Sequence, residues 1–389
     1  MTNRQYDIVV FGATGFTGQL VAEYLARRSR TESTRWAIAG RSAQKLDELA
    51  ATLGVTDLGR IVADVADRES MSRLAADTQV VATTVGPYAR YGEPVVRACV
   101  EAGTDYVDIT GEPQFVDMTL LRYHAVAREK GIRVVSCCGF DSIPHDLGVY
   151  FTVRQLPENI PLRVEGFVRA KGAFSGGTWN SAIDAFSTFG EVKKLRKERR
   201  SMQEKLPPGR RVGSTKPKVH REHRLGGWAV PLPTIDSDVV LRSAALDPRY
   251  GPDFRYGHYV RIKKLSQVVG GTAMVAGIFV GAQWRPTRSW LKKMRSSGDG
   301  PSAEQRARSR FEVVFLAEGG DHSVRCRVAG GDPGYDETAK MLGESALCLA
   351  HDRDRLPGPV GVVPPAGAMG QALLDRLIRS GLTFEVLEN

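Results

Sequence analysis

A glycine-rich turn between an apolar run and an amphipathic run, within residues 7–18, constrains the fold of this chain more than any other feature. The apolar run is typical of a buried parallel strand, and the pattern after the turn is typical of a helix. The glycines Gly12, Gly15 and Gly18 follow a G-x-x-G-x-x-G spacing, whereas G-x-G-x-x-G is commoner. Between a strand and a helix, such glycines indicate a dinucleotide site in a doubly wound α/β fold, and a plain tight turn is the alternative.

Each glycine has a predicted role in that site. Gly12 allows the tight turn, Gly15 lets a pyrophosphate approach the backbone, and Gly18 lets the helix pack closely on the strand. The phosphates would then lie on free N–H groups at the positive end of the helix. The residues predicted to form this part of the site are Gly12, Thr14, Gly15, Phe16, Thr17 and Gly18.

The residues after the second predicted strand, 35–40, indicate which nucleotide binds. An NAD site normally has Asp or Glu there to hydrogen-bond the ribose 2′-hydroxyl. This chain has Arg41 and Ser42 instead, with Lys45 one turn into the next helix. Arg41 can bind a 2′-phosphate in a forked geometry and Ser42 can donate to it, so NADP(H) is the predicted cofactor. An exposed loop arginine is the alternative.

Three further apolar runs, 79–85, 106–109 and 132–137, predict parallel strands whose polar ends surround the nicotinamide, because ligands lie outside the carboxyl ends of such strands. The first of these runs leads into Gly86 and Pro87, which are predicted to contact the cofactor. An earlier strand, near residues 61–62, leads to Asp64 and Val65, which are predicted to lie near the adenine.

Length and patterning predict more than one domain in a chain of 389 residues. We expect a Rossmann domain over 1–150, an α+β domain with a largely antiparallel sheet over 151–334, and C-terminal helices over 335–389 that pack back on the first domain. In the second domain, residues 162–169 alternate as a strand does. The runs 311–316 and 323–328 predict a hairpin with Val324, Cys326 and Val328 facing inward.

The first strand begins by residue 7, which leaves no room for a signal peptide and favours a cytoplasmic protein, with the inner face of the plasma membrane as an alternative surface. The five cysteines are expected to be reduced. Cys137 and Cys138 end a strand and are predicted to be small buried residues, with a redox pair as the alternative. The histidines and cysteines show no metal-binding spacing, so no metal is expected.

Residues 191–224 contain thirteen Lys or Arg and four Glu, a net charge of +9 in a chain of net charge +10. The pattern predicts a charged helix over 191–205 and a mobile basic loop over 210–224. A solvated surface explains this charge, and docking onto a phospholipid surface or an acyl carrier protein is the alternative. No nucleic acid is expected, because the run lacks interleaved aromatic residues.

Residues 268–282 are fifteen uncharged residues, fewer than the roughly twenty that span a bilayer. Trp284 and Trp290 follow, among cationic residues, as they do at membrane interfaces. A buried core helix is one interpretation, and a segment that lines an acyl-chain channel or enters a membrane surface is the other.

Several motifs, in this order, resemble those of the saccharopine dehydrogenase-like oxidoreductases and, within them, the trans-acting enoyl reductase branch of mycobacterial type. The resemblance covers residue 7 to the C-terminus. The motifs are Gly-Ala-Thr-Gly-Phe-Thr-Gly, Ala39-Gly40-Arg41, Gly86-Pro87-Tyr88, Cys138-Gly139-Phe140-Asp141-Ser142-Ile143-Pro144, Ser175-Gly176-Gly177-Thr178, Asp332-Pro333-Gly334-Tyr335 and Met341-Leu342-Gly343-Glu344-Ser345. The resemblance implies a Rossmann domain with an inserted α+β domain, and reduction of a double bond in a polyketide or long-acyl lipid intermediate. The chain departs from the pattern at His145, where a small residue such as Ser is expected.

Enoyl reduction needs a hydride for the β-carbon, a partner for the acyl carbonyl and a proton for the α-carbon. Tyr88 and Tyr91 are candidate proton donors or carbonyl partners, with pocket walls as the alternative. Asp141 and His145 could relay a proton, although Asp141 could equally cap a helix. The sequence also predicts a turn that holds a substrate carbonyl or carboxylate, formed by Ser175, Gly176, Gly177 and Thr178. A plain capped turn is the alternative.

Two other functions are consistent with the sequence. A saccharopine-type amino-acid dehydrogenase would need several cations that converge on substrate carboxylates. A non-catalytic lipid-surface protein would use NADP(H) as a structural or sensing ligand. A homodimer is compatible with the sequence.

Overall fold

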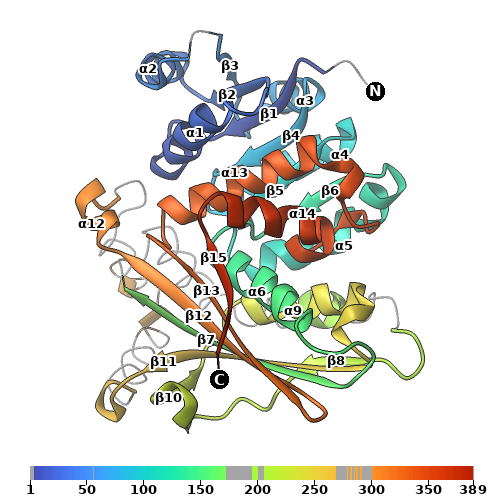
Figure 1. The fold of residues 1–389 in the computed structure, drawn as a ribbon. Helices are drawn as coiled ribbons and strands as arrows, with labels where there is room; N and C mark the ends of the chain where they lie inside the picture. Colours follow the sequence, from blue (N-terminus) through green and yellow to red (C-terminus); the bar gives the residue numbers. More distant parts are fainter. Residues whose placement is uncertain are drawn as a thin grey trace.

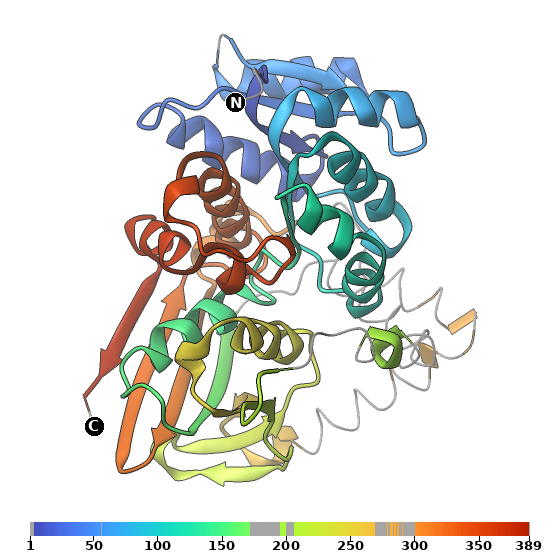
Figure 2. The ribbon, with the colours of Figure 1, turned by 90° about the vertical axis from the view of Figure 1, so that its right-hand side faces the viewer.

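The computed structural model describes residues 4–55, 57–171, 195–199, 206–268 and 300–388, with a few single positions between 278 and 290. It places two β-sheets at opposite ends of the molecule, with helices α13 (Asp336–His351) and α14 (Pro365–Arg379) on the side of the first sheet that faces the second (Figures 1 and 2). Within these residues, no helix is both long enough and apolar enough to cross a bilayer.

The first sheet is wholly parallel, in the order β14-β6-β5-β4-β1-β2-β3. From β1 the chain builds outward through β2 and β3, then returns to the other side of β1 with β4, so the strand order reverses between β1 and β4. This reversal is where an open α/β sheet binds its ligand. The strands are β1 (Tyr6–Phe11), β2 (Trp36–Gly40), β3 (Gly59–Val62), β4 (Thr78–Thr83), β5 (Asp105–Asp108), β6 (Arg133–Val135) and β14 (Gly361–Val362).

Helices cover both faces of this sheet, which explains the apolar runs in the sequence. Every residue of β2 and β5 is buried, and so is all of β1 after its first residue. One face carries α1 (Phe16–Arg28), α2 (Ala43–Leu53) and α13, and the other carries α3 (Arg68–Ala76), α4 (Tyr88–Ala102) and α5 (Pro113–Glu129). The predicted doubly wound parallel sheet is confirmed.

The second sheet is mixed, in the order β15-β13-β12-β7-β11-β10-β9, with β8 also paired to β11. The pairs β7–β11 and β8–β11 are parallel, and the other pairs are antiparallel. Its strands are β7 (Leu162–Lys171), β8 (Arg211–Ser214), β9 (His220–Glu222), β10 (Gly227–Pro231), β11 (Asp253–Ile262), β12 (Arg310–Gly319), β13 (His322–Gly330) and β15 (Thr383–Leu387).

The predicted hairpin is confirmed as β12 and β13, which pair antiparallel along their whole length. Cys326 and Val328 are fully buried, and Val324 is partly buried against the same core. Alternation along β13 therefore follows from one face packing on the core while the other is partly exposed.

Two helices from different parts of the chain, α6 (Ile143–Val153) and α9 (Asp236–Leu246), pack on the second sheet and on α14. One hydrophobic cluster runs from β1 and α1 through α13 and α14 to α6 and the second sheet. The two sheets therefore share a core. Short helices η1 (His223–Leu225), η2 (Pro248–Tyr250), η3 (Arg353–Arg355) and α12 (Ala303–Ala307) complete the described elements.

The C-terminal segment contributes to both sheets, which the sequence patterns did not predict. Besides α13 and α14, residues 361–362 form the edge strand β14 of the first sheet, next to β6. Residues 383–387 form β15, which pairs with β13 in the second sheet. The chain therefore passes between the two sheets again after the second sheet is built.

The prediction of a mobile basic loop over 210–224 is wrong, because β8, β9 and η1 occupy this stretch. Three of its cations have local partners. Arg210 donates to the carbonyl oxygen of Ala245 at 3.0 Å, Arg211 lies 2.8 Å from Asp253, and Arg224 lies 3.0 Å from Glu222 and from Glu318.

Residues 195–199 are helical, as predicted, and the rest of the expected helix 191–205 lies outside the described residues. Most of the apolar segment 268–282 also lies outside them. Of the residues after it, Trp284 and Trp290 are described and are 66% and 62% exposed.

Candidate functional site

The glycine turn has the geometry that its predicted roles require. Gly12 has φ of +87°, and a Cβ there would lie 2.7 Å from Val85. A Cβ on Gly18 would lie 2.1 Å from the Gly12 carbonyl oxygen, so the first turn of α1 packs directly on the loop. Beside Gly15, the nearest atom to a Cβ would be that same oxygen at 3.4 Å. The turn therefore needs glycine at its start and in the helix, and it leaves its backbone accessible at Gly15.

The N-terminus of α1 supplies the expected anion-binding groups. The first N–H groups of a helix have no intrahelical acceptor, and here they belong to Phe16, Thr17 and Gly18. Thr14 lies beside the end of β2, with its hydroxyl 3.6 Å from the Cβ position of Gly40. These groups fit the pyrophosphate of a dinucleotide.

The ring of Phe16 contacts residues from the far end of the chain. It meets Tyr335 edge-on with 4.9 Å between ring centroids, and the guanidinium carbon of Arg306 lies 5.6 Å from its centroid. Elements that belong with the second sheet therefore reach the entrance of the nucleotide turn.

The end of β2 presents two exposed cations, Arg41 and Lys45. Arg41 forms no ion pair with any residue that the structure describes. Ser42 is the N-cap of α2, and its hydroxyl oxygen accepts from the N–H of Lys45 at 3.3 Å, which leaves its proton free to donate. This donor set fits a 2′-phosphate.

Asp64 and Val65 follow β3, where the adenine is predicted, and both are partly buried. One oxygen of Asp64 accepts from the N–H of Ala66 at 2.9 Å, which fixes the turn. Their contact with the adenine stays a prediction.

After β4, the loop through Gly86 and Pro87 leads into α4. The N–H groups of Tyr88 and Ala89 donate to the carboxylate of Glu112, at 3.0 and 2.9 Å. Glu112 is only 2% exposed, so it fixes this loop against the end of β5. Sequence motifs do not reveal this role, because the carboxylate caps a helix that begins 24 positions before it.

The structure contradicts a proton-donor role for Tyr88. Its hydroxyl donates to the carbonyl oxygen of Thr83 at 3.0 Å, and its ring packs on Phe115 in the core. Burial raises the pKa of this phenol well above its ordinary value. Tyr88 therefore holds the end of β4 in place. Tyr91 is half-buried, with the guanidinium carbon of Arg90 5.0 Å from its ring centroid, and stays a candidate.

Asp141 lies beside the end of β5, as the predicted convergence of the strand ends requires. A Cβ on Gly111 would be 2.8 Å from its carboxylate oxygen. Ser142 is the N-cap of α6 and no side-chain cap bond is formed there, which argues against Asp141 as a helix cap. Burial, with a smaller contribution from Asp236, raises the pKa of Asp141 to about 7. This carboxyl can hold a proton near neutral pH.

His145 is buried on α6, but the side chains that it contacts lie in the second domain. Its Nε2 lies 3.8 Å from Asp236 on α9, and its ring meets that of His258 on β11 edge-on, with 4.5 Å between centroids. Burial lowers the pKa of His145 to about 3, so its imidazole is neutral. The predicted relay with Asp141 is therefore replaced by a cluster with Asp236 and His258.

Two other buried carboxyls near these strand ends went unpredicted. Asp108, at the end of β5, accepts from the N–H of Thr110 at 2.9 Å and from that of Cys137 at 3.0 Å, and burial raises its pKa to about 6. Asp146 on α6 accepts from the N–H of Ala366 at 2.7 Å, and burial raises its pKa to about 7. Asp108 was detectable as an acid at a strand end. The role of Asp146 could not be predicted from the sequence, because it depends on α14 packing beside α6.

Cys137 and Cys138 are buried, free thiols, as predicted, and burial raises the pKa of both, which disfavours the reactive thiolate. The predicted substrate turn, Ser175 to Thr178, lies outside the described residues.

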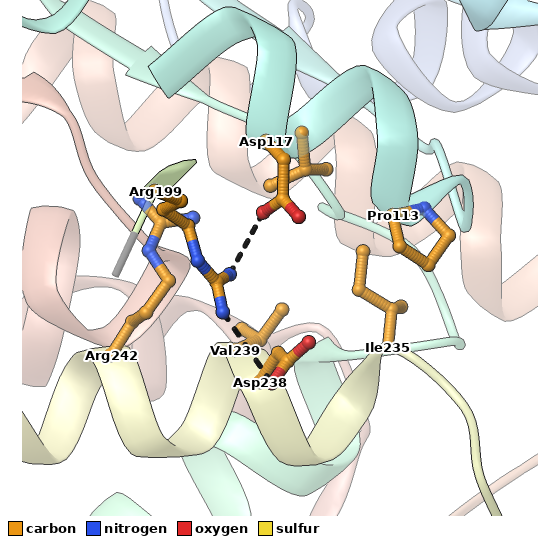
Figure 3. Close-up of a pocket in the computed structure, with 8 residues that line it drawn as sticks. Pro113, Asp117, Arg199, Ile235, Asp238, Val239 and Arg242 are labelled. Carbon is orange, nitrogen blue, oxygen red and sulfur yellow. Dashed lines mark ion pairs between the residues drawn. The ribbon is translucent and has the colours of Figure 1, made fainter. Parts of the chain in front are cut away.

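A pocket between α5 and α9 is closed by ion pairs (Figure 3). Arg199 lies 2.9 Å from Asp117 on α5 and 3.8 Å from Asp238 on α9, so it joins the first sheet's helices to the second domain. Figure 3 shows its guanidinium between the two carboxylates. The lining residues are Pro113, Val116, Asp117, Arg199, Ile235, Asp238, Val239 and Arg242. We interpret this pocket as a connection between domains.

Comparison with known proteins agrees with this geometry. Residues 8–135 match the family model of the saccharopine dehydrogenase NADP binding domain. The chain is 35% identical to a trans-acting enoyl reductase of Mycobacterium ulcerans, over 97% of each chain. It is 33% identical to a saccharopine dehydrogenase-like oxidoreductase of Bos taurus, over 99% of this chain and 98% of that one.

Among solved structures, the fold is similar to that of apo saccharopine dehydrogenase (L-Glu forming) from Saccharomyces cerevisiae. The TM-score is 0.53 at 14% identity, over 98% of this chain and 100% of the other. The first domain thus binds NADP(H), and the chain belongs to the saccharopine dehydrogenase-like oxidoreductase family.

Proposed function

We propose that this protein is an NADPH-dependent enoyl reductase that reduces a carbon–carbon double bond of a polyketide or long-acyl lipid intermediate. The observation that carries the proposal is the position of Asp141, whose carboxylate lies beside Gly111 at the carboxyl edge of the parallel sheet, where burial raises its pKa to about 7. The full-length similarity to the trans-acting enoyl reductase of Mycobacterium ulcerans supports the same reaction.

The described residues at the strand ends would have separate roles in binding and proton transfer. The N–H groups of Phe16, Thr17 and Gly18 would hold the pyrophosphate, and Arg41 with Lys45 would hold the 2′-phosphate. When bound, NADPH supplies the hydride for the β-carbon. Asp141, which is about half protonated at pH 7, would give the proton to the α-carbon.

The charge near the strand ends favours this reaction over an amino-acid dehydrogenase, although the name of the bovine relative supports that alternative. Cations that could receive substrate carboxylates are already engaged in the described part of the chain. Arg199 pairs with Asp117 and Asp238, and Arg242 donates to the carbonyl oxygen of Val362 at 3.0 Å. The charged group that acts on Asp141 is another carboxylate, Asp236.

Oxidation of NADPH by the purified protein tests the proposal, with long-chain enoyl thioesters in one series and an amine donor plus a 2-keto acid in the other. We expect turnover with the enoyl thioesters, and a saturated acyl product by mass spectrometry. Turnover only with the amine and keto acid would replace the proposal with the saccharopine-type reaction. NADPH binding without turnover in either series would favour a lipid-surface protein.

We also propose how the acyl chain reaches the site. Delivery on an acyl carrier protein or from a membrane surface suits the exposed Trp284 and Trp290 and the excess of basic residues in 210–224. Co-sedimentation with anionic vesicles and pull-down with an acyl carrier protein separate the two routes, and the same samples would show by sedimentation velocity whether the protein is a homodimer.

A further inference from the structure

Three buried side chains from three separate elements meet where α6 packs on the second domain. They are His145 on α6, Asp236 in the first turn of α9 and His258 on β11, and they are 2%, 3% and 6% exposed. Their ligand-type atoms all lie within 4.8 Å of one another. The proposed reduction uses none of the three directly.

Their polar atoms are left without partners in a way that is unusual for a protein interior. Nδ1 of His145, Oδ1 of Asp236 and Nε2 of His258 are buried and have no hydrogen-bond partner among the described residues. Buried polar atoms are nearly always hydrogen-bonded, and each exception requires an explanation such as an ion. A cation held by these side chains would supply that explanation for Oδ1 of Asp236 and Nε2 of His258.

The separations suit a small divalent ion. Nε2 of His258 lies 3.4 Å from Oδ2 of Asp236, and Nε2 of His145 lies 3.8 Å from Oδ1. Ligands at about 2.0 Å from a tetrahedral Zn²⁺ lie about 3.3 Å apart. The two histidine–aspartate separations therefore lie within about 0.5 Å of that value, and all three ligand atoms lie within 4.8 Å of one another.

The surrounding residues orient two of the three side chains. The hydroxyl of Tyr256 lies 3.3 Å from Nδ1 of His258, which directs the opposite nitrogen, Nε2, toward Asp236. The Thr234 hydroxyl donates to Oδ2 of Asp236. Such outer contacts, which fix ring orientation and carboxylate position, accompany most metal-ligating residues.

The donor set indicates the class of ion. Two imidazoles and one carboxylate offer two nitrogen ligands and one oxygen ligand. Mg²⁺ and Ca²⁺ prefer oxygen ligands, whereas imidazole suits Zn²⁺ and its first-row neighbours. Three protein ligands also leave one coordination position for water or another oxygen.

We propose that His145, Asp236 and His258 bind one divalent transition-metal ion of the Zn²⁺ class at the junction of the two domains. The three ligands are not among the residues assigned to the reaction above, although Asp236 also contributes to the raised pKa of Asp141. It also accounts for the departure at His145, which turns a position where a small residue is expected into a ligand.

Direct titration of the chelator-treated, full-length protein tests this site. Co²⁺ is the first probe, because its visible absorption reports the ligand geometry, and Zn²⁺ is then added to displace it while calorimetry measures the affinity. We expect one equivalent of Co²⁺ with a tetrahedral or five-coordinate spectrum, and full displacement by Zn²⁺.

Three variants connect that signal to the residues. His145→Ser and His258→Gln each remove a ligand and are expected to weaken binding by about 100-fold or more, since loss of an outer-shell contact alone costs about 10–100-fold. Asp236→Asn keeps the shape of the side chain and removes its charge, so it tests the site even if a histidine variant folds poorly. His322→Ser, at an exposed histidine on β13, is the matched control and should bind as the parent does.

Two results would overturn the proposal. One is the absence of stoichiometric Co²⁺ or Zn²⁺ binding to the folded parent protein. The other is binding that survives His145→Ser and Asp236→Asn unchanged, which would place the ion elsewhere on the chain. Circular dichroism of each variant identifies those that have lost their fold.

Discussion

We propose that Arg41 carries the preference for NADPH, because it is an exposed cation at the end of β2 without an ion pair among the described residues. Arg41→Ala should weaken NADPH binding by about 10- to 100-fold, since a hydrogen bond to a charged group contributes about 1.5–3 kcal/mol. NADH affinity should change little, because NADH has no 2′-phosphate. Fluorescence titration with both nucleotides measures this difference.

The matched control is Arg30→Ala, which removes an exposed arginine near the end of α1, away from the strand ends, and changes the net charge equally. It should leave both affinities unchanged. Equal losses of affinity for NADPH and NADH in Arg41→Ala would mean that Arg41 supports the fold of the loop and does not bind the 2′-phosphate.

The raised pKa of Asp141 predicts that turnover depends on pH, since burial and Asp236 raise this pKa to about 7. As a proton donor it is active when protonated, so turnover should fall about tenfold per pH unit above that value. Asp141→Asn should lower turnover by about 10²- to 10⁴-fold and abolish this dependence. Steady-state rates across pH 5–9 check both effects.

The same residue should affect stability with a definite sign. An unfolded Asp titrates near a pKa of about 3.9, so between that value and 7 the folded protein binds the proton more tightly than the unfolded chain does. Stability then falls as pH rises through this window. Asp141→Asn should therefore raise the melting temperature at pH 8 more than at pH 5, and an equal effect at both pH values would argue against the raised pKa.

At the residue scale, the role of a residue could be predicted from the sequence where the local backbone geometry determines that role. The roles of Gly12 and Gly18 follow from the turn itself, and the contacts around both agree with them. Arg41 could be found because its position depends on one strand end. Asp236 and His258 could not, because their proximity to His145 arises only when α9 and β11 pack against α6. Tyr88 was misassigned because a motif does not show which way a ring points.

At the scale of elements, a buried arginine joins α13 and α14 to the loop that follows α1. Arg376 on α14 is 3% exposed and lies 2.5 Å from Glu32 and 3.3 Å from Glu344 on α13, and it also pairs with Asp352. Arg376→Met should cost about 3 kcal/mol of unfolding free energy, because it leaves buried carboxylates without their shared cation. Urea denaturation measures the loss.

Arg379→Ala, at an exposed arginine on the same helix, is the comparison and should change stability by less than about 0.5 kcal/mol. A loss below about 1 kcal/mol in Arg376→Met would mean that Arg28, which lies 2.9 Å from Glu344, carries most of the compensation.

Long elements were predictable because one periodicity runs through them, as in the β12–β13 hairpin, where inward residues alternate. Short strands and strands at or near the edge of a sheet could not be predicted. β14 has only two residues, and it is a strand because β6 offers it an open edge. β8 has only four residues and β9 only three, and they become strands because β11 and β10 pair with them. In each case the pairing partner determines the structure.

At the scale of the whole molecule, the shared hydrophobic cluster predicts a single unfolding unit. It includes Val10 on β1, Leu347 on α13 and Phe315 on β12, each fully buried. Calorimetry should show one transition, and NADP⁺ at 100 times its dissociation constant should add about 2.7 kcal/mol to the stability of the whole protein. Two transitions, of which NADP⁺ shifts only one, would contradict this prediction.

The position of β14 has a consequence for how the protein is made. Until residues 361–362 leave the ribosome, β6 has no partner on its outer side, while the entire second sheet except β15 is being synthesised. An open strand edge is a template for pairing with other chains. The nascent protein must therefore carry an incomplete first sheet through most of its synthesis, and a chain cut short before residue 361 would keep that edge permanently open.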